Sequence, residues 1–225
     1  MIIKSNHSNT PIWRDIHVHA ILPPELHPLE EISPNLWWVW NEEAKAIFEV
    51  LDPEEGEKSG KNPVLMMQNL QSDITESAIN NKELMDRIHR VYDKFKHYMS
   101  QSYNTNRPSV AYFSMESGLS HVLKIYSGGL GVLAGDYLKE ASDSRVNMTA
   151  VGFLYRYGYF TQSLSVDGQQ IANYEAQNFG SLPITQVMND DGTPMILEVP
   201  FHDRTIYSNI WKVAVGRINL YLMDT

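Results

Sequence analysis

The chain has 225 residues, enough for one large or two small domains, and 43% of them are hydrophobic, which is ample for a packed core. A formal net charge of -9, without any block rich in lysine and arginine, argues against nucleic acid and anionic membrane as main partners. The absence of cysteine excludes a disulfide framework and thiolate chemistry, and no apolar run approaches the ~20 residues that span a bilayer.

The first 34 residues are rich in proline and histidine and lack the apolar core of a signal peptide, so we predict a cytoplasmic protein. His17 and His19 alternate as metal ligands on a strand can do. Surface histidines are the better interpretation of this pair, and we predict no metal site.

Three tryptophans, Trp37, Trp38 and Trp40, fall within six residues. Flat aromatic rings can stack on sugars, and they can equally form a core that seats a helix. Because Leu36 and Val39 lie among them and a helical segment follows, we favour the core.

The next segments are mainly helical. A helix is predicted from about Glu42 to Leu51 with Asn41 as its N-cap, and Asn62-Pro63 starts another. The charged segment between them, Asp52–Lys61, is predicted to be a solvated loop. From Lys82, apolar residues recur at helical spacing and form one stripe: Leu84, Ile88, Val91, Phe95 and Met99. We therefore predict a mainly helical leader region over residues 1–105 that packs on a sheet domain.

From about residue 106 the chain has α/β character. Ser109–Met115 and Met148–Tyr155 are predicted strands, with a glycine-rich loop and a helix between them. This order begins a doubly wound sheet, in which ligands bind at the carboxyl ends of the strands. Further strands are predicted at Met195–Phe201, Ile206–Val215 and Arg217–Met223, the last two forming a hairpin.

The loop residues Gly128, Gly129, Leu130 and Gly131 are the first candidate binding site. Glycine lacks a Cβ, so the backbone can bend sharply and approach a ligand closely. The helix that follows directs its free amides and positive dipole end at that ligand, which favours an anion such as phosphate. The spacing is not the dinucleotide-binding pattern, and a plain tight turn remains the alternative.

Three other residues are candidates. Glu116 closes the first strand, where a carboxylate could orient a sugar hydroxyl or a catalytic lysine, or could cap the next segment or pair with Arg156. Asp136 lies about two turns into the loop helix, and one carboxylate without a partner is not an acid–base pair. His121 could bind a sugar hydroxyl, although a structural role is favoured.

Ordered blocks across the chain resemble the α-glucan (glycogen) phosphorylases, and the short bacterial and archaeal type most of all. The blocks are Asn35–Asn41, Gly60–Leu65, Ala111–Glu116, Ile125–Asp143 and Val151–Gln162. The sequence departs from that type at Lys124, where proline is usual, at Ser117, where an aromatic is usual, and over residues 144–147. These departures concern the local geometry of the chain rather than its resemblance to the family.

The resemblance implies the N-terminal Rossmann-like half of a type-B glycosyltransferase fold, incomplete over 106–225. Such enzymes release α-glucose 1-phosphate from α-1,4-glucan or maltodextrin using inorganic phosphate. Their pyridoxal phosphate is held by a lysine of a C-terminal domain, so we expect no cofactor site in this chain and no activity from it alone. The loop at Gly128–Gly131 would lie over the sugar and phosphate subsites. A homo-oligomer or a separately encoded C-terminal part is the expected partner.

Two alternatives stay open. Glycosyltransferases of the glycogen or starch synthase kind, which use nucleotide sugars, also carry a Gly-Gly-Leu-Gly loop, but a lysine usually precedes it where Ser127 stands here. A non-catalytic glucan-binding fragment is the third interpretation, and the tryptophan cluster motivates it.

Overall fold

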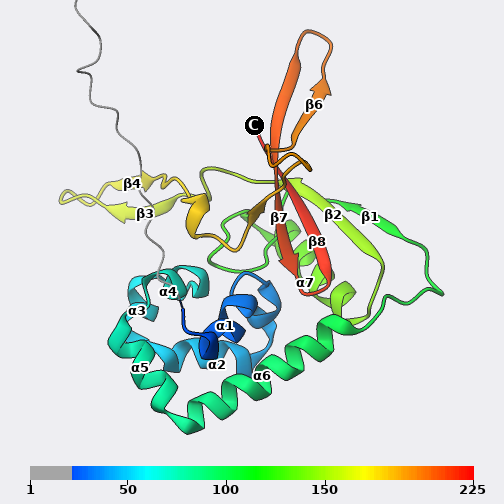
Figure 1. Ribbon diagram of the computed structural model, residues 1–225. Coiled ribbons are helices and arrows are strands. Elements are labelled where there is room, and N and C mark those ends of the chain that lie inside the picture. Colours follow the sequence, from blue (N-terminus) through cyan, green and yellow to red (C-terminus); the bar gives the residue numbers. More distant parts are fainter. Residues whose placement is uncertain (1–21) are drawn as a thin grey trace, which may run out of the picture.

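A computed structural model describes residues 22–225, so His17 and His19 lie outside the described residues. The first half of this region is helical (Figure 1). Its elements are η2 (Pro24–Leu26), α1 (His27–Ile32), η3 (Leu36–Trp40), α2 (Glu42–Leu51), α3 (Pro53–Lys58), α4 (Pro63–Asn69), α5 (Ser72–Asn80) and α6 (Lys82–Ser100). Among the described residues, no helix is both long and apolar enough to cross a membrane.

Side-chain caps set the beginnings of four leader helices, α2, α3, α4 and α6. Asn41 Oδ1 accepts a hydrogen bond from the amide of Ala44 at 3.0 Å, which confirms the predicted start of α2. The prediction of a loop over Asp52–Lys61 is wrong, because α3 lies within it. Asp52 caps this helix from the residue before Pro53, the same arrangement of cap and first-turn proline that begins α4 at Asn62.

The tryptophan cluster belongs mainly to the core. Trp37 and Trp38 are 4% and 3% exposed, so the core interpretation is confirmed and the sugar-stacking interpretation is wrong for these two rings. Trp37 lies 5.3 Å from Phe95 of α6, centroid to centroid. The predicted α6 stripe is buried from Leu84 to Phe95, whereas Met99 is 37% exposed.

The second half is built on a mixed sheet, in which antiparallel strands join the parallel strands that a doubly wound fold predicts. Its spatial order is β1-β2-β8-β7-β5, and β6 also pairs with β7. Strands β1, β2 and β8 are parallel, whereas β7 runs antiparallel to β8, β5 and β6. The strands are β1 (Val110–Phe113), β2 (Met148–Phe153), β3 (Thr161–Leu164), β4 (Gln170–Asn173), β5 (Thr185–Gln186), β6 (Ile196–Pro200), β7 (Thr205–Val215) and β8 (Ile218–Asp224), with η4 (Phe179–Ser181) before β5.

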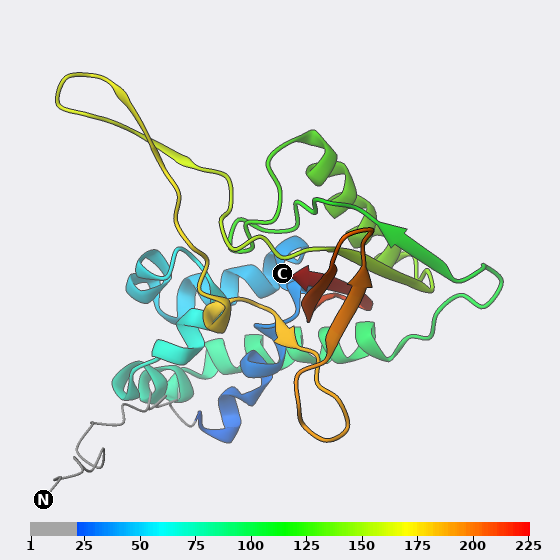
Figure 2. The same ribbon diagram turned by 90° about the horizontal axis from the view of Figure 1, so that it is seen from above.

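Several sequence predictions hold in this half. Helix α7 (Gly129–Asp143) follows the glycine loop and leads to β2. The β7–β8 hairpin is confirmed, and Gly216 at its turn has φ 57°, which favours glycine. The hairpin β3–β4 pairs only within itself and extends away from the rest (Figures 1 and 2). The boundary at residue 105 stays a prediction, although leader and sheet share one cluster of buried residues.

One sheet face is buried, and the other is only partly covered, since Val151 and Tyr221 on it are half-buried. On the buried face, Ala150, Leu220 and Val213 are aligned by register and almost fully covered. Helix α7 lies behind these strands in Figure 1, and no described helix passes in front of them. On the opposite face Phe113 is 73% exposed and Phe153 is 40% exposed.

A buried arginine joins the two halves. Arg217 is 6% exposed, and its guanidinium donates to the carbonyls of Tyr98 (2.7 Å) and Ser142 (2.6 Å) and to Gln101 Oε1 (2.9 Å). The guanidinium also lies 3.5 Å from the centre of the Tyr98 ring, a close cation–π contact. The β7–β8 hairpin is thereby fixed to the C-terminal ends of both α6 and α7.

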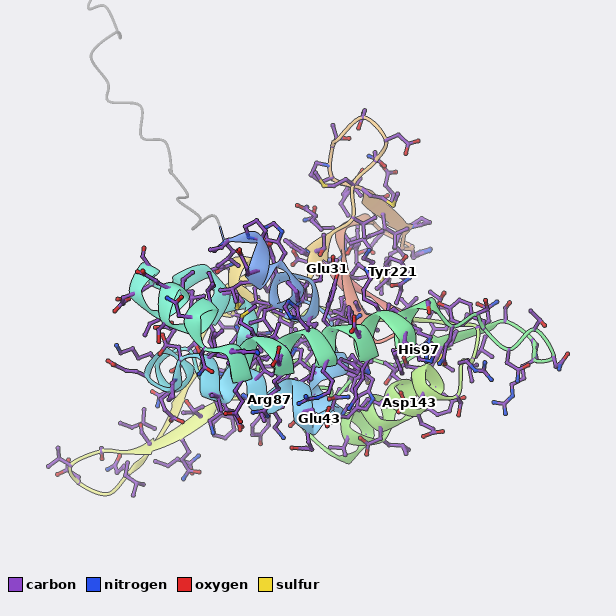
Figure 3. The ribbon with its side chains drawn as sticks, turned by 60° about the horizontal axis from the view of Figure 1, so that its bottom comes forward. Glu31, Glu43, Arg87, His97, Asp143 and Tyr221 are labelled. Atoms are coloured by element: carbon purple, nitrogen blue, oxygen red, sulfur yellow. The ribbon has the colours of Figure 1, made fainter. Side chains whose placement is uncertain are left out.

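Asn35 completes this junction from the leader side. Its side chain accepts from the Gly216 amide at 2.9 Å and donates to the Gly216 carbonyl at 3.1 Å. Tyr98 donates its hydroxyl to Asp143 at 2.7 Å, and burial raises the pKa of Tyr98 far above its ordinary range. Figure 3 shows Asp143 beside the C-terminal end of α6, near His97.

Replacing Arg217 with methionine is expected to lower the free energy of unfolding by about 3 kcal/mol. The substitution leaves two buried carbonyls without their donor, which urea denaturation monitored by circular dichroism will detect. The control is Arg90→Met on the exposed side of α6, which should change stability by at most about 0.5 kcal/mol. Equal effects of the two variants would contradict the role assigned to the junction.

Candidate active site

The candidate site lies where β1 ends and α7 begins. Glu116 follows β1, and its carboxylate accepts from the Ser127 hydroxyl at 2.7 Å and from the Ser127 amide at 3.2 Å. No hydrogen bond or ion pair within the described residues joins Glu116 to Arg156. Glu116 therefore ties the end of the first strand to the start of the glycine loop.

The loop surrounds this carboxylate with donors, as an anion requires. The Ser127 hydroxyl, the Ser127 amide and the nearby amides of Gly128 and Gly131 hold the pKa of Glu116 below its ordinary value of 4.5. The structure thus places a carboxylate of the protein itself at the N-terminal end of α7, at the position where the sequence predicts an external anion.

Gly131 and Gly135 are required by close packing. A Cβ on Gly135 would lie 2.1 Å from the Gly118 carbonyl oxygen, and one on Gly131 would lie 2.4 Å from the Tyr126 Cβ. The Gly118 amide also donates to the Gly131 carbonyl at 2.7 Å. Helix α7 can therefore approach the segment after β1 only because these positions lack side chains.

Gly128 and Gly129 are different. A Cβ at either position would have no described heavy atom within 4 Å, and neither residue has a positive φ. Packing within the described residues therefore does not require glycine here. At the first two positions of α7, the amides of Gly129 and Leu130 have no acceptor within the helix. This open space beside free amides is where a ligand can reach the backbone.

Three hydrogen bonds at this end of the sheet were missed by sequence reasoning. Tyr155, just after β2, donates its hydroxyl to the Met115 carbonyl at 2.9 Å, and burial raises the pKa of this phenol. Gln177 donates to the Tyr155 carbonyl at 2.7 Å and accepts from the Lys124 amide at 2.9 Å. The two partners of Gln177 lie 22 and 53 residues away in the sequence, and no local sequence pattern predicts such a bridge.

The remaining predicted residues lie away from the loop. Asp136 is exposed on α7, about 10 Å along the helix from Gly129, and its carboxylate lies 3.6 Å from Lys139 Nζ. His121 Nε2 lies 2.9 Å from the Gly60 carbonyl, and the ring lines a pocket of the leader with Trp38 and Met66. The structure therefore brings together Glu116, Gly128 and Gly131, and it separates Asp136 and His121 from them.

Comparison with known proteins identifies relatives for almost the whole chain. Residues 22–123 match a family described as "Protein of unknown function (DUF3417)", a match that ends just before the glycine loop. The maltodextrin phosphorylase of Thermococcus litoralis is 38% identical over an alignment of 215 residues, and the alignment covers 92% of this chain and 26% of that protein.

Two glycogen phosphorylases are similar to the same extent. The Aquifex aeolicus protein is 37% identical over 88% of this chain and 29% of its own length. The Mycobacterium tuberculosis protein is 34% identical over 94% of this chain and 26% of its own length. The chain therefore spans about a quarter of the length of these relatives.

Replacing Ser127 with alanine is expected to raise the pKa of Glu116 towards 4.5, because the hydroxyl makes the largest contribution to lowering it. A carboxyl-detected NMR titration measures this directly. The lowered pKa also makes Glu116 favour the folded state above pH 4.5, and this contribution is lost as the pH falls through the folded-state pKa. An unchanged titration in the variant would show that the hydroxyl does not hold the carboxylate.

Replacing Gly135 with alanine is expected to destabilise the fold by about 2 kcal/mol, because its Cβ would collide with the Gly118 backbone. Gly129→Ala is the matched control in the same helix. Its Cβ meets open space, so stability should change by at most about 1 kcal/mol, as thermal unfolding can measure. If both variants unfold alike, the close approach is not what requires glycine at 135.

Proposed function

The chain is homologous to the N-terminal quarter of maltodextrin and glycogen phosphorylases, and from this premise we propose that it forms one wall of an α-glucan phosphorylase active site. The observation that carries the proposal is the open space at Gly128 and Gly129. The reaction proposed is the release of α-glucose 1-phosphate from α-1,4-glucan by inorganic phosphate. The sheet that bears the loop would be the first part of a Rossmann-like domain.

In this proposal the amides of Gly129 and Leu130 donate to the sugar or phosphate oxygens of the substrates. Backbone amides at a helix N-terminus are fixed in place, so they need little reorganisation when the reaction develops charge. Glu116 acts as a positioning residue. By accepting a hydrogen bond from the Ser127 hydroxyl at 2.7 Å, it fixes the start of the loop.

Neither Lys124 nor Lys139 is suited to bind the pyridoxal phosphate that the family resemblance implies. A Schiff base needs a lysine that can lose its proton within a closed pocket. Lys139 Nζ lies 3.6 Å from the Asp136 carboxylate, and Lys124 is exposed, so neither amine lies in a closed pocket of its own. We therefore assign the cofactor lysine to polypeptide other than this chain, and no step here depends on the cofactor.

The alternatives have less support in the structure. Trp37 and Trp38 are buried, so two of the three rings that motivated a glucan-binding fragment offer no open stacking face. In the nucleotide-sugar glucosyltransferases a lysine is expected before the glycines. Here Ser127 stands at that position and its hydroxyl is engaged by Glu116.

The test uses the 225-residue chain alone and joined to the remaining three quarters of the Thermococcus litoralis maltodextrin phosphorylase. The joined protein, given maltodextrin, phosphate and pyridoxal phosphate, should release glucose 1-phosphate. Gly129→Ala should reduce kcat/KM about 100-fold, because the added methyl occupies the space of the substrate. The chain alone should give no product and, after borohydride reduction, no stoichiometric pyridoxal adduct by intact mass.

The fold of the Gly129→Ala protein must match that of the parent in thermal unfolding, so that lost activity reports on the site. Full activity in this variant would contradict the assignment of the loop. A single-site pyridoxal adduct on the chain alone would show that the cofactor lysine lies within it. Incorporation of glucose from a nucleotide sugar, without phosphorolysis, would favour the synthase-like alternative.

A further inference from the structure

The glycine loop lies at the end of a long connection. Residues 114–128 join β1 to α7 and contain no helix or strand. Connections in α/β units are commonly about 2–6 residues long, and much longer ones without structure of their own are usually functional or disordered. Gly128 and Gly129 have open space around them, and glycine loses more conformational freedom on ordering than any other residue. The position of the loop must therefore be fixed by contacts along the connection.

The middle of this connection is held by the core and by Gln177. Leu123 and Ile125 are almost fully buried, whereas Lys124 between them is exposed. Gln177 Oε1 accepts from the Lys124 amide at 2.9 Å, and Gln177 Nε2 donates to the Lys124 carbonyl at 3.2 Å. One side chain thereby pairs with both backbone groups of the exposed residue, as a neighbouring strand would.

Gln177 is itself fixed to the segment that follows β2. Its Nε2 also donates to the Tyr155 carbonyl at 2.7 Å, and its backbone amide donates to the Arg156 carbonyl at 2.7 Å. The same segment packs directly against Lys124, since a Cβ on Gly158 would lie 2.6 Å from the Lys124 Cβ. With two donors and one acceptor engaged, the Gln177 side chain has one orientation that satisfies all of its contacts.

Tyr155 connects this segment to the end of β1. Its hydroxyl donates to the Met115 carbonyl at 2.9 Å, at the beginning of the connection. Within the connection, the Ser117 amide donates to the Ile125 carbonyl at 3.2 Å. Hydrogen bonds therefore run from the end of β1 through Tyr155 and Gln177 to the middle of the connection, and from there back to its beginning. The members of such a network reinforce one another.

We propose that Gln177 and Tyr155 are positioning residues of the glycine loop, which they hold through the backbone of Lys124 and the end of β1. The two side chains act on the backbone of the connection rather than on a substrate. They keep the free amides of Gly129 and Leu130 directed at the sugar or phosphate oxygens, and in this purpose the inference rests on the proposed function. A misplacement of about 1 Å can cost about 100-fold in rate, so a looser loop loses activity while the protein stays folded.

The first experiment measures the motion of the loop in the 225-residue chain by nitrogen-15 relaxation. Gln177→Met keeps the approximate length of the side chain and removes its three hydrogen bonds. The order parameters of the Gly129 and Leu130 amides should fall from about 0.85 to below about 0.6. The Lys124 amide loses its acceptor and should exchange with solvent at least about tenfold faster.

Gln68→Met is the matched control. Gln68 Nε2 donates to the Gly180 carbonyl at 3.1 Å, so this variant also removes a long-range hydrogen bond of a glutamine side chain, but one outside the connection. It should leave the order parameters of Gly129 and Leu130 unchanged. Tyr155→Phe removes a single hydroxyl and should loosen the loop in the same direction as Gln177→Met. It serves the same test if Gln177→Met does not fold.

The second experiment uses the protein joined to the remaining three quarters of the Thermococcus litoralis maltodextrin phosphorylase. Gln177→Met and Tyr155→Phe should each lower kcat/KM about tenfold, because the amides are no longer held in place. The double variant should lose much less than about 100-fold, because either substitution breaks the same network. Gln68→Met should keep the parent value.

The outcomes separate this inference from the proposed function. Unchanged order parameters in Gln177→Met, or the same loosening in Gln68→Met, would overturn the inference. So would losses of kcat/KM that simply multiply in the double variant. If the joined parent protein gives no phosphorolysis, the proposed function fails, whereas the loosened loop of the chain alone would still uphold the positioning role.

Discussion

The buried contact between Arg217 and the ends of two helices is the constraint on which the rest of the structure depends. A guanidinium has five donors in a rigid fork, and here three partners come from segments about 75 to 119 residues away. Losing one partner would leave part of this buried guanidinium without its hydrogen bond. The hairpin β7–β8, α6 and α7 must therefore meet in one geometry, and the helical leader becomes a support for the sheet.

That geometry also fixes the candidate site. The junction holds the C-terminal end of α7, while the contacts of Gly131 and Gly135 hold its first half against the segment after β1. With both parts of the helix fixed, Ser127 reaches Glu116 and the Gly128–Gly129 backbone faces open space. The glycines of this loop therefore have two roles. Gly131 permits the close packing of α7, whereas Gly128 and Gly129 leave room for a ligand.

The sequence predicts the structural features that depend on residues close together in the chain. Helix caps at Asn41 and Asn62, the α6 stripe and the β7–β8 hairpin follow from neighbours within about four residues, and the structure confirms them. The missed helix α3 carried the same cap signal, at Asp52-Pro53, obscured by its charged composition. The pairing of β5 with β7, the bridge made by Gln177 and the separation of His121 from the loop depend on long-range contacts, which local sequence patterns do not encode.

The open loop and the open sheet edge are consequences of one topology. In a doubly wound sheet the crevice for the ligand forms between the loop after the first strand and the loop after the strand added beside it. Glu116 and Gly128 follow β1, and β1 pairs with β2 and with no other described strand. A strand that pairs with β1 would therefore carry its own following loop to the far side of Gly128. The residues that pair with β1 would therefore also supply the second side of the crevice at Gly128.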